Sequence, residues 1–209
     1  RATEINSKTH YYNSYMCEAK YQIKTGRTLE ALATINKMTE EAQSENNKFG
    51  LFNGKMLLGH IYQARNNPAT ALDNYQEAIK LDNQMPGETL INAEVYANIA
   101  NCHISLYNLD KALQNINKGL SLQRIRRSTK SHLKANECKC YFMTHQLDTF
   151  ISKYNEFREF KEKYDPEYHT TEENNVEIYK AIYDKDYSKA IELNKKTASA
   201  LDRADNMQI

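Results

Sequence analysis

The chain has 209 residues, a length that suits one large domain or two small ones. Hydrophobic residues make up 40% of it and charged residues 26%, so it carries the large apolar groups that disordered proteins lack. Its 28 basic and 27 acidic residues give a formal net charge of +1, which excludes the strong global field that attracts nucleic acid or an anionic membrane.

The sequence shows no membrane-spanning segment and no signal peptide at its start. No apolar run approaches the roughly 20 residues that a membrane-spanning helix needs, and the N-terminus has no signal-peptide pattern. The chain begins with Arg1 instead of Met and ends within a helical pattern, so we expect it to be a fragment of a longer protein. The cysteines are predicted to be small buried thiols and not a disulfide framework: Cys17, Cys102, Cys138 and Cys140.

Five similar turns organise the chain from beginning to end. Each turn joins polar or glycine residues to a small or aromatic residue that is followed by Leu or Ile. The small or aromatic residues follow one another at steps of 40, 41, 38 and 40 residues: Ala31, Ala71, Ala112, Phe150 and Ala190. This even spacing predicts five repeats in a single solenoid domain, at about 8–46, 47–86, 87–127, 128–166 and 167–209.

Each turn lies between two stretches of helical periodicity. Before and after Asn67, apolar residues recur at intervals of three and four residues. Pro68 suits the first turn of a helix, where its missing N–H needs no partner. Pro86-Gly87 and Asp165-Pro166 are predicted to end the second helices of their repeats. The sequence therefore predicts an all-α chain of ten antiparallel helices joined by short turns.

Two of the repeats carry a known motif. The second contains Leu58, Gly59, Tyr62, Ala71, Tyr75 and Ala78, and the third contains Ile99, Ala100, His103, Ala112, Ile116 and Gly119. Both sets resemble the tetratricopeptide repeat (TPR), although Lys55 and Asn83 replace its usual Trp and Pro. The other three repeats match the motif more weakly. The resemblance implies a right-handed α-α superhelix, a TPR-like solenoid of about five helix pairs.

Small residues at the motif positions are predicted to let helices pack closely. Gly59 and Ala100 allow the second helix of a repeat to approach the first, and Ala71 and Ala112 allow the next repeat to approach in turn. A larger side chain at such a position would cost roughly 1–3 kcal/mol through overpacking.

The length of the repeat resembles one group of TPR proteins in particular. Repeats of about 40 residues and a composition rich in Lys, Asn and Tyr are similar to the TPR sensor regions of Bacteroidetes-type bacteria, which are joined to histidine kinases or helix-turn-helix regulators. This resemblance implies a non-enzymatic module that binds a protein or peptide, as the sensor or scaffold region of a larger signal-transduction regulator. By analogy alone it favours the periplasm, with the cytoplasm as the alternative.

An alternative function is a structural scaffold that mediates homo-oligomerisation or complex assembly. The last helix is predicted to present an apolar stripe that needs another repeat, a capping helix or a second copy of the chain. The stripe consists of Ile191, Leu193, Ala198 and Leu201.

No set of residues predicts catalysis, a cofactor or a metal site. His103 occupies the position of Tyr62 in the preceding repeat and is interpreted as a packed core ring. Cys138 and Cys140 lie two residues apart on a predicted helix, so their thiols point about 200° apart and cannot share a metal. The chain also lacks a Gly-rich phosphate loop, a G-x-S-x-G motif and a zincin motif. We therefore expect that it is not an enzyme.

Basic residues gather between the third and fourth repeats: Arg124, Arg126, Arg127, Lys130 and Lys134. Without interleaved aromatic residues, this run is interpreted as a solvated turn or a partner contact, and phosphate contacts are the alternative. The partner expected for the region as a whole is a protein or peptide and not a nucleic acid.

The TPR resemblance implies that the first helices of the repeats line a concave groove. By repeat offsets, the candidate binding residues on that face are Asn53, His60, Asn98, Asn101, Asn136 and Lys139. An amide side chain both donates and accepts hydrogen bonds, so it can pair with a peptide backbone of any sequence. The alternative explanation is the general richness of the chain in asparagine. Met16 and Lys20 stand where the two-carboxylate clamp of some TPR domains has Lys and Asn, which disfavours docking of a chaperone C-terminus.

Overall fold

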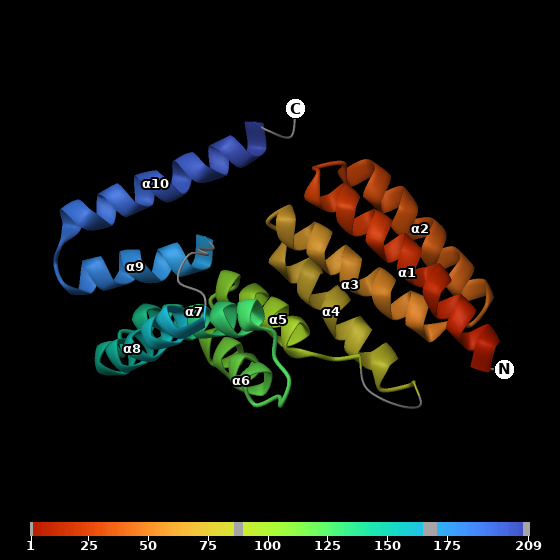
Figure 1. Cartoon of the computed structure of the whole chain (residues 1–209), viewed down its shortest axis with the longest axis horizontal. Coiled ribbons are helices and arrows are strands. Elements are labelled where there is room, and N and C mark those ends of the chain that lie inside the picture. The colour runs from red at the N-terminus through yellow and green to blue at the C-terminus, as the bar shows by residue number, and fades with distance from the viewer. Residues whose placement is uncertain (1, 86–89, 165–170, 207–209) are drawn as a thin grey trace. The chain divides into compact units, whose positions relative to one another are not determined.

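The computed structural model describes the backbone of residues 2–85, 90–164 and 171–206 and the side chains of residues 8–85, 90–164 and 173–198. Within these ranges every regular element is an α-helix, and the ten helices follow one another as five pairs (Figure 1). Their bounds are α1 Ala2–Lys24, α2 Thr28–Ser44, α3 Lys48–Ala64, α4 Pro68–Asp82, α5 Ala93–Ser105, α6 Leu109–Leu120, α7 Arg127–Met143, α8 Leu147–Tyr164, α9 Thr171–Tyr183 and α10 Tyr187–Asn206. The predicted ten helices in five pairs are confirmed.

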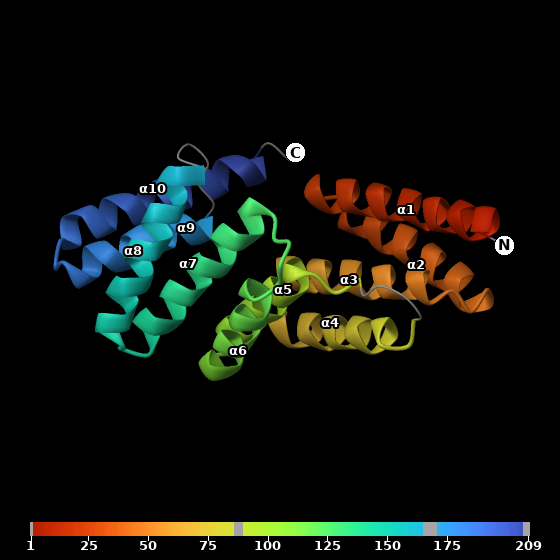
Figure 2. The ribbon, with the colours of Figure 1, turned by 60° about the horizontal axis from the view of Figure 1, so that its bottom comes forward.

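The chain divides into two compact units, Arg1–Ile91 with α1 to α4 and Asn92–Ile209 with α5 to α10. In the first unit, α1 packs on α2 and on α3, and α3 packs on α4 (Figures 1 and 2). In the second unit, the first helices of successive pairs pack on one another, α5 on α7 and α7 on α9, while each second helix packs on its own first helix. The first helices of neighbouring pairs are thus adjacent within a unit, as expected for helix-pair repeats.

The core of the first unit lies between α1, α2 and α3. Its largest fully buried side chains are Tyr12, Ile35, Met38, Leu57 and Ile61. Glycines on α3 permit this close packing, since a Cβ at Gly50 would lie 2.7 Å from the Cβ of Ala42 and one at Gly54 would clash with Cγ2 of Thr39.

The second unit contains successive clusters along the stack. Cys140 belongs to the cluster that α7 forms with α5 and α6, whereas Cys138 belongs to the cluster with Phe150, Phe157 and Val176. The two neighbouring cysteines therefore face opposite sides of α7, as predicted from the helical rotation between them. Cys102 is also buried, but Cys17 is exposed, so the expectation of a buried thiol is wrong for Cys17. The physical reason is that the helices packed on α1 leave this position uncovered.

All five turns within the helix pairs have the same backbone conformation. One residue in each has a positive φ, and these residues are Gly26, Asn66, Tyr107, His145 and Lys185. The N–H of the following residue donates to a carbonyl of the last helical turn, as from Asn67 to the Tyr62 carbonyl at 2.8 Å and from Asn108 to that of His103 at 2.8 Å. This is the Schellman helix ending, which favours glycine or asparagine at the left-handed position. The turn residues repeat at the same steps as the small or aromatic residues that come five positions later.

Side-chain caps begin several of the helices. Asn47, Asn67 and Asn92 accept hydrogen bonds from N–H groups in the first turns of α3, α4 and α5. Pro68 follows its cap at the first position of α4, as predicted. The predicted helix-ending pairs Pro86-Gly87 and Asp165-Pro166 lie outside the described residues; α4 ends at Asp82 and α8 at Tyr164.

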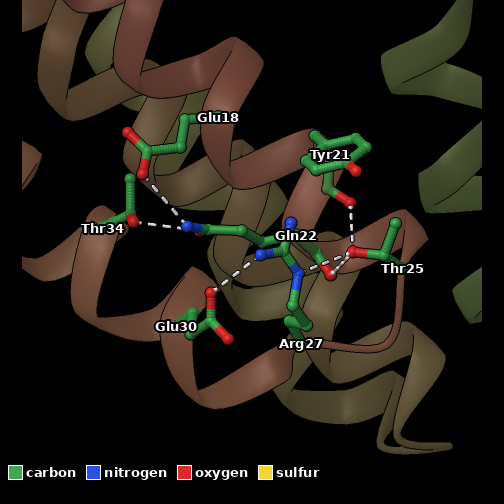
Figure 3. A network of polar contacts seen from close by, with 7 residues as sticks. All are labelled: Glu18, Tyr21, Gln22, Thr25, Arg27, Glu30 and Thr34. Carbon is green, nitrogen blue, oxygen red and sulfur yellow. Dashed lines mark hydrogen bonds and ion pairs between the residues drawn. The ribbon is translucent and has the colours of Figure 1, made fainter. Parts of the chain in front are cut away.

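Polar contacts stabilise the first turn, between α1 and α2 (Figure 3). The buried side chain of Gln22 donates from Nε2 to Glu18 at 3.1 Å and accepts at Oε1 from the Thr34 hydroxyl at 2.9 Å. Arg27 lies over the Tyr21 ring, 4.9 Å from its centroid, and donates to Glu30 at 3.1 Å. Because Gln22 and Thr34 come from different helices, their hydrogen bond sets the register of the pair.

Candidate binding site

Two adjoining hollows lie where α5 and α7 pack together in the second unit. The larger has a volume of about 270 Å³, and its walls are Glu94, Ala97 and Asn98 of α5 and Arg126, Ser128, Thr129 and His132 at the start of α7. The smaller has a volume of about 100 Å³ and is lined by Asn92, Ala93, Glu94, Arg124, Arg126 and Thr129. Since Glu94, Arg126 and Thr129 line both, the two hollows form one site on the face of successive first helices.

The local fold explains why these side chains meet. Arg126 has extended backbone (φ −61°, ψ 141°), and α7 begins directly after it, without a side-chain cap. Arg126 therefore provides no side-chain cap to α7, and the start of the helix, with the positive end of its dipole, lies beside the hollow. On the other wall, Glu94 and Asn98 are four residues apart on α5, so they share one face of that helix.

Of the six predicted groove residues, the structure places four in this unit. Asn98 lines the larger hollow, Asn101 and Lys139 are half-buried further along α5 and α7, and Asn136 is only 1% exposed. A side chain so deeply buried offers no surface to a partner. Asn136 is therefore a buried residue of α7 and does not line either hollow.

The other two predicted residues lie in the first unit, on α3. Asn53 is 7% exposed, and its Nδ2 donates to the carbonyl of Phe49 at 2.9 Å. His60 is half-buried, with its ring edge-on to Tyr75 at a centroid distance of 5.8 Å. Asn53 thus bonds to the backbone of its own helix, while His60 contacts the second helix of its pair.

Most of the basic run has contacts outside the hollows. Arg127 lies over the Tyr164 ring at 5.5 Å, Lys130 lies over the Phe160 ring at 5.6 Å, and Lys134 pairs with Glu156 at 3.3 Å. Arg124 and Arg126 are exposed, and neither forms an ion pair within the described part of the chain. Only these two arginines line the hollows.

Two polar nitrogen atoms on α7 are buried without a hydrogen-bond partner among the described residues: Nε2 of His132 and Nδ2 of Asn136. They lie one helical turn apart, and His132 lines the larger hollow. A buried polar atom left unpaired costs about 1–3 kcal/mol, so a group bound in the larger hollow that supplied a partner for His132 would recover part of that cost.

Other reactive side chains have ordinary structural surroundings. Burial raises the pKa of the Cys102 thiol to about 11 and that of the Cys140 thiol to about 12, which makes both poor nucleophiles. His103 is 6% exposed, as expected of a core ring, and burial lowers its pKa. Within the described residues there is no group of three or more metal-ligating side chains, and none of the helices searched is long and apolar enough to cross a membrane.

Comparison with known sequences identifies the type of repeat that two of the helix pairs form. The sequence profile of the tetratricopeptide repeat family matches residues 54–85, most of α3 and α4, and residues 93–125, which contain α5 and α6. Two segments of the chain match the tetratricopeptide repeat. These are the two repeats in which the sequence motif is most complete, so the predicted TPR resemblance is confirmed for them.

Comparison with solved structures extends the likeness over nearly the whole chain. The structure is similar to a crystal structure of nearly identical TPR-like repeats from a putative kinesin light chain of Podosopora anserina. The TM-score is 0.63 at 10% sequence identity, and the match covers 93% of this chain and 96% of that one. This confirms the predicted all-α, TPR-like fold. No curated protein matches the chain.

Tetratricopeptide repeats are in general non-catalytic scaffolds that mediate contacts between proteins. The hollow lies between α5 and the start of α7, the first helices of two successive pairs. The structure also shows what repeat offsets alone missed: Arg126 lines the site, although it did not belong to the predicted set. The basic run was the signal that could have pointed to Arg126.

Proposed function

We propose that this chain is a non-enzymatic module that binds a protein or peptide segment along its first helices. The observation that carries the proposal is the polar hollow between α5 and α7, where Asn98, Arg126 and His132 converge. A half-exposed amide, an arginine and an imidazole provide donors and acceptors for a peptide backbone and its side chains. The family match favours the same function, because TPR arrays bind partners through such faces.

The finer proposal is that the module is the sensor or scaffold region of a larger bacterial signal-transduction regulator. The repeat length of about 40 residues favours it. Ligand binding would bias an attached output domain only if the ligand binds one arrangement of the helix pairs more tightly than another. The proposed compartment, by analogy, is the periplasm, with the cytoplasm as the alternative.

A peptide-array screen tests the binding function. The full chain is incubated with several thousand unrelated 12-residue peptides, and the affinity of the best binders is measured in solution. We expect Asn98→Ala and Asn101→Ala each to weaken binding by about five- to tenfold, the value of a lost hydrogen bond. Asn117→Ala is the matched control, since Asn117 is exposed and lies on α6, a second helix of a pair, whereas Asn98 and Asn101 lie on the first helix α5.

The outcome distinguishes two ways in which the proposal can fail. If no peptide binds, the module is not a peptide receptor. If peptides bind but Asn98→Ala and Asn101→Ala bind them as well as the unaltered chain does, the site lies elsewhere.

A second candidate function is homo-oligomerisation through the last helix. Ile191 is 56% exposed and Tyr187 59% exposed on α10, and large apolar groups side by side on one helix favour an interface. Leu193, also in the predicted stripe, is half-buried, and the side chain of Leu201 lies outside the described residues. Sedimentation equilibrium decides this: a dimer that Ile191→Asp converts to a monomer supports the candidate, and a monomer at all concentrations rejects it.

A further inference from the structure

The charges around the α5–α7 hollow indicate what kind of group it accepts. Five basic residues lie near the start of α7. Arg127 and Lys130 lie over the rings of Tyr164 and Phe160, Lys134 pairs with Glu156, and none of these three lines either hollow. The guanidinium groups that remain for a ligand are those of Arg124 and Arg126, which both line the smaller hollow. A guanidinium matches the two oxygens of a carboxylate in a bidentate arrangement.

Further donors converge on the same volume. The Ser128 and Thr129 hydroxyl groups and the Asn98 amide line the larger hollow, and the uncapped start of α7 adds the positive end of its dipole. The imidazole of His132 forms another part of the wall, and its Nε2 is buried without a partner among the described residues. Arginine, hydroxyl, amide and imidazole groups together form a donor-rich site that favours an anion.

One acidic side chain limits which anion fits. Glu94 lines both hollows and forms no ion pair with Arg124 or Arg126 in the described part of the chain. Its carboxylate repels a dense array of negative charge but accepts a hydrogen bond from a peptide N–H. The site is therefore suited to a single carboxylate carried on a peptide backbone.

We propose that the α5–α7 hollow binds the carboxylate of an acidic residue in a partner peptide, with Arg126 as the main contact. This inference rests on the proposed peptide-binding function and names the chemistry of its ligand. Arg126 contacts the carboxylate, Arg124 adds charge at the adjoining hollow, and Glu94 faces the peptide backbone.

A nucleic acid is disfavoured as the occupant by the same contacts. Binding to a phosphate backbone depends on several lysine and arginine residues acting together. Here, three of the five basic side chains are engaged by other residues, and the carboxylate of Glu94 lines the same hollow as the two that remain.

The test uses a matched pair of probes with the full chain. One is a fluorescent, capped 12-residue peptide taken from the array binders that contain Asp or Glu, and its twin carries Asn or Gln at those positions. We expect the acidic peptide to bind about tenfold more tightly than its twin at low salt. Arg126→Gln should weaken binding of the acidic peptide about tenfold and leave the affinity of its twin unchanged. Glu94→Gln should strengthen binding of the acidic peptide.

Arg65→Gln provides the control, because Arg65 is an exposed arginine in the other unit and its removal changes the net charge equally. Circular dichroism checks that each variant is folded. Equal affinity of the two peptides, or equal loss with Arg65→Gln and Arg126→Gln, overturns the carboxylate assignment while leaving peptide binding intact. Tighter binding of a 12-nucleotide single strand than of the acidic peptide also overturns it, in favour of phosphate. Absence of any array binder rejects the underlying function instead.

Discussion

The ring of Tyr75 occupies the space that a side chain at position 59 would need. A Cβ built on Gly59 would lie 2.7 Å from Cδ1 of Tyr75 and closer still to Cε1 of the same ring. Tyr75 is fully buried, and its hydroxyl donates to Oε1 of Gln63 at 2.9 Å, so the ring cannot move aside easily. The approach of α4 to α3 therefore depends on this glycine.

Gly59→Ala is expected to destabilise the protein. In the interior of a helix this change normally stabilises by roughly 0.5–1 kcal/mol, so a loss of stability reports the clash with Tyr75. We expect a net loss of about 1–3 kcal/mol, measured as a shift of the urea unfolding midpoint. Combining it with Tyr75→Leu should cost less than the sum of the single changes. A more stable Gly59→Ala variant would contradict the assigned contact.

Lys185→Gly is expected to stabilise the protein. Lys185 has a φ of 62° in the turn between α9 and α10, a conformation that costs a side-chain-bearing residue roughly 1–2 kcal/mol. Glycine removes this cost, but its greater freedom in the unfolded chain offsets part of the gain. We therefore expect the free energy of unfolding, measured by thermal unfolding, to rise by about 0.5–1 kcal/mol. Lys195→Gly, at an exposed position in the middle of α10, is the control and should destabilise by a similar amount. The same sign for both variants would refute the argument.

Lys161→Met is expected to destabilise the second unit strongly. The Lys161 ammonium lies 3.1 Å from Oε2 of Glu173, both side chains are at most 5% exposed, and Ser131 donates to the same carboxylate. Removing one partner of a buried ion pair leaves the other charge unpaired, at a cost of about 3–5 kcal/mol. The double variant Lys161→Met with Glu173→Leu should recover much of the loss. A double variant no more stable than the single one would show that the pair itself is not the cause.

The stability of the fold is expected to fall with acidification in part through His103. Burial, with a smaller contribution from the charge of Lys111, lowers the pKa of His103 below its ordinary value. The folded state therefore binds this proton less readily than the unfolded state. The stability that neutral His103 contributes is present above the ordinary histidine pKa, near 6.5, and is lost as the pH falls through the folded-state pKa.

Thermal midpoints at a pH of about 7.5 and about 5 check this expectation. The midpoint should drop less in His103→Phe than in the unaltered chain, whereas His10→Gln, at an exposed position, should leave the drop unchanged. An equal drop in His103→Phe would show that other groups account for it.

Thiol labelling should distinguish the four cysteines. Cys17 is exposed, whereas Cys102, Cys138 and Cys140 are buried, and burial raises the pKa of the Cys138 thiol to about 12. Because the thiolate is the reactive form, a disulfide reagent should modify one thiol rapidly in the native protein and all four in denaturant. Cys17→Ser should abolish the rapid phase. Rapid modification of a second thiol would contradict the described packing of α5 and α7.

Several features of the fold were predictable because they depend on neighbours within one repeat. Helical periodicity, the turn positions and the small residues at Ala31, Ala71 and Ala112 are set by residues a few positions apart along the chain. The same local reasoning placed His103 in the core and turned Cys138 and Cys140 to opposite sides of one helix. It did not show that Cys17 is exposed, since that depends on which helices lie beside α1.

The candidate site depended instead on contacts between repeats. Arg126 and Glu94 meet because α7 begins beside α5, and Asn136 is buried because neighbouring helices cover it. Likewise, three basic residues lie against Tyr164, Phe160 and Glu156, which come from α8. The sequence alone thus determined the helices and their recurrence, through short-range periodicity. Only the tertiary structure decided which polar groups remain available to a partner, because pairing and burial are set by residues of other helices.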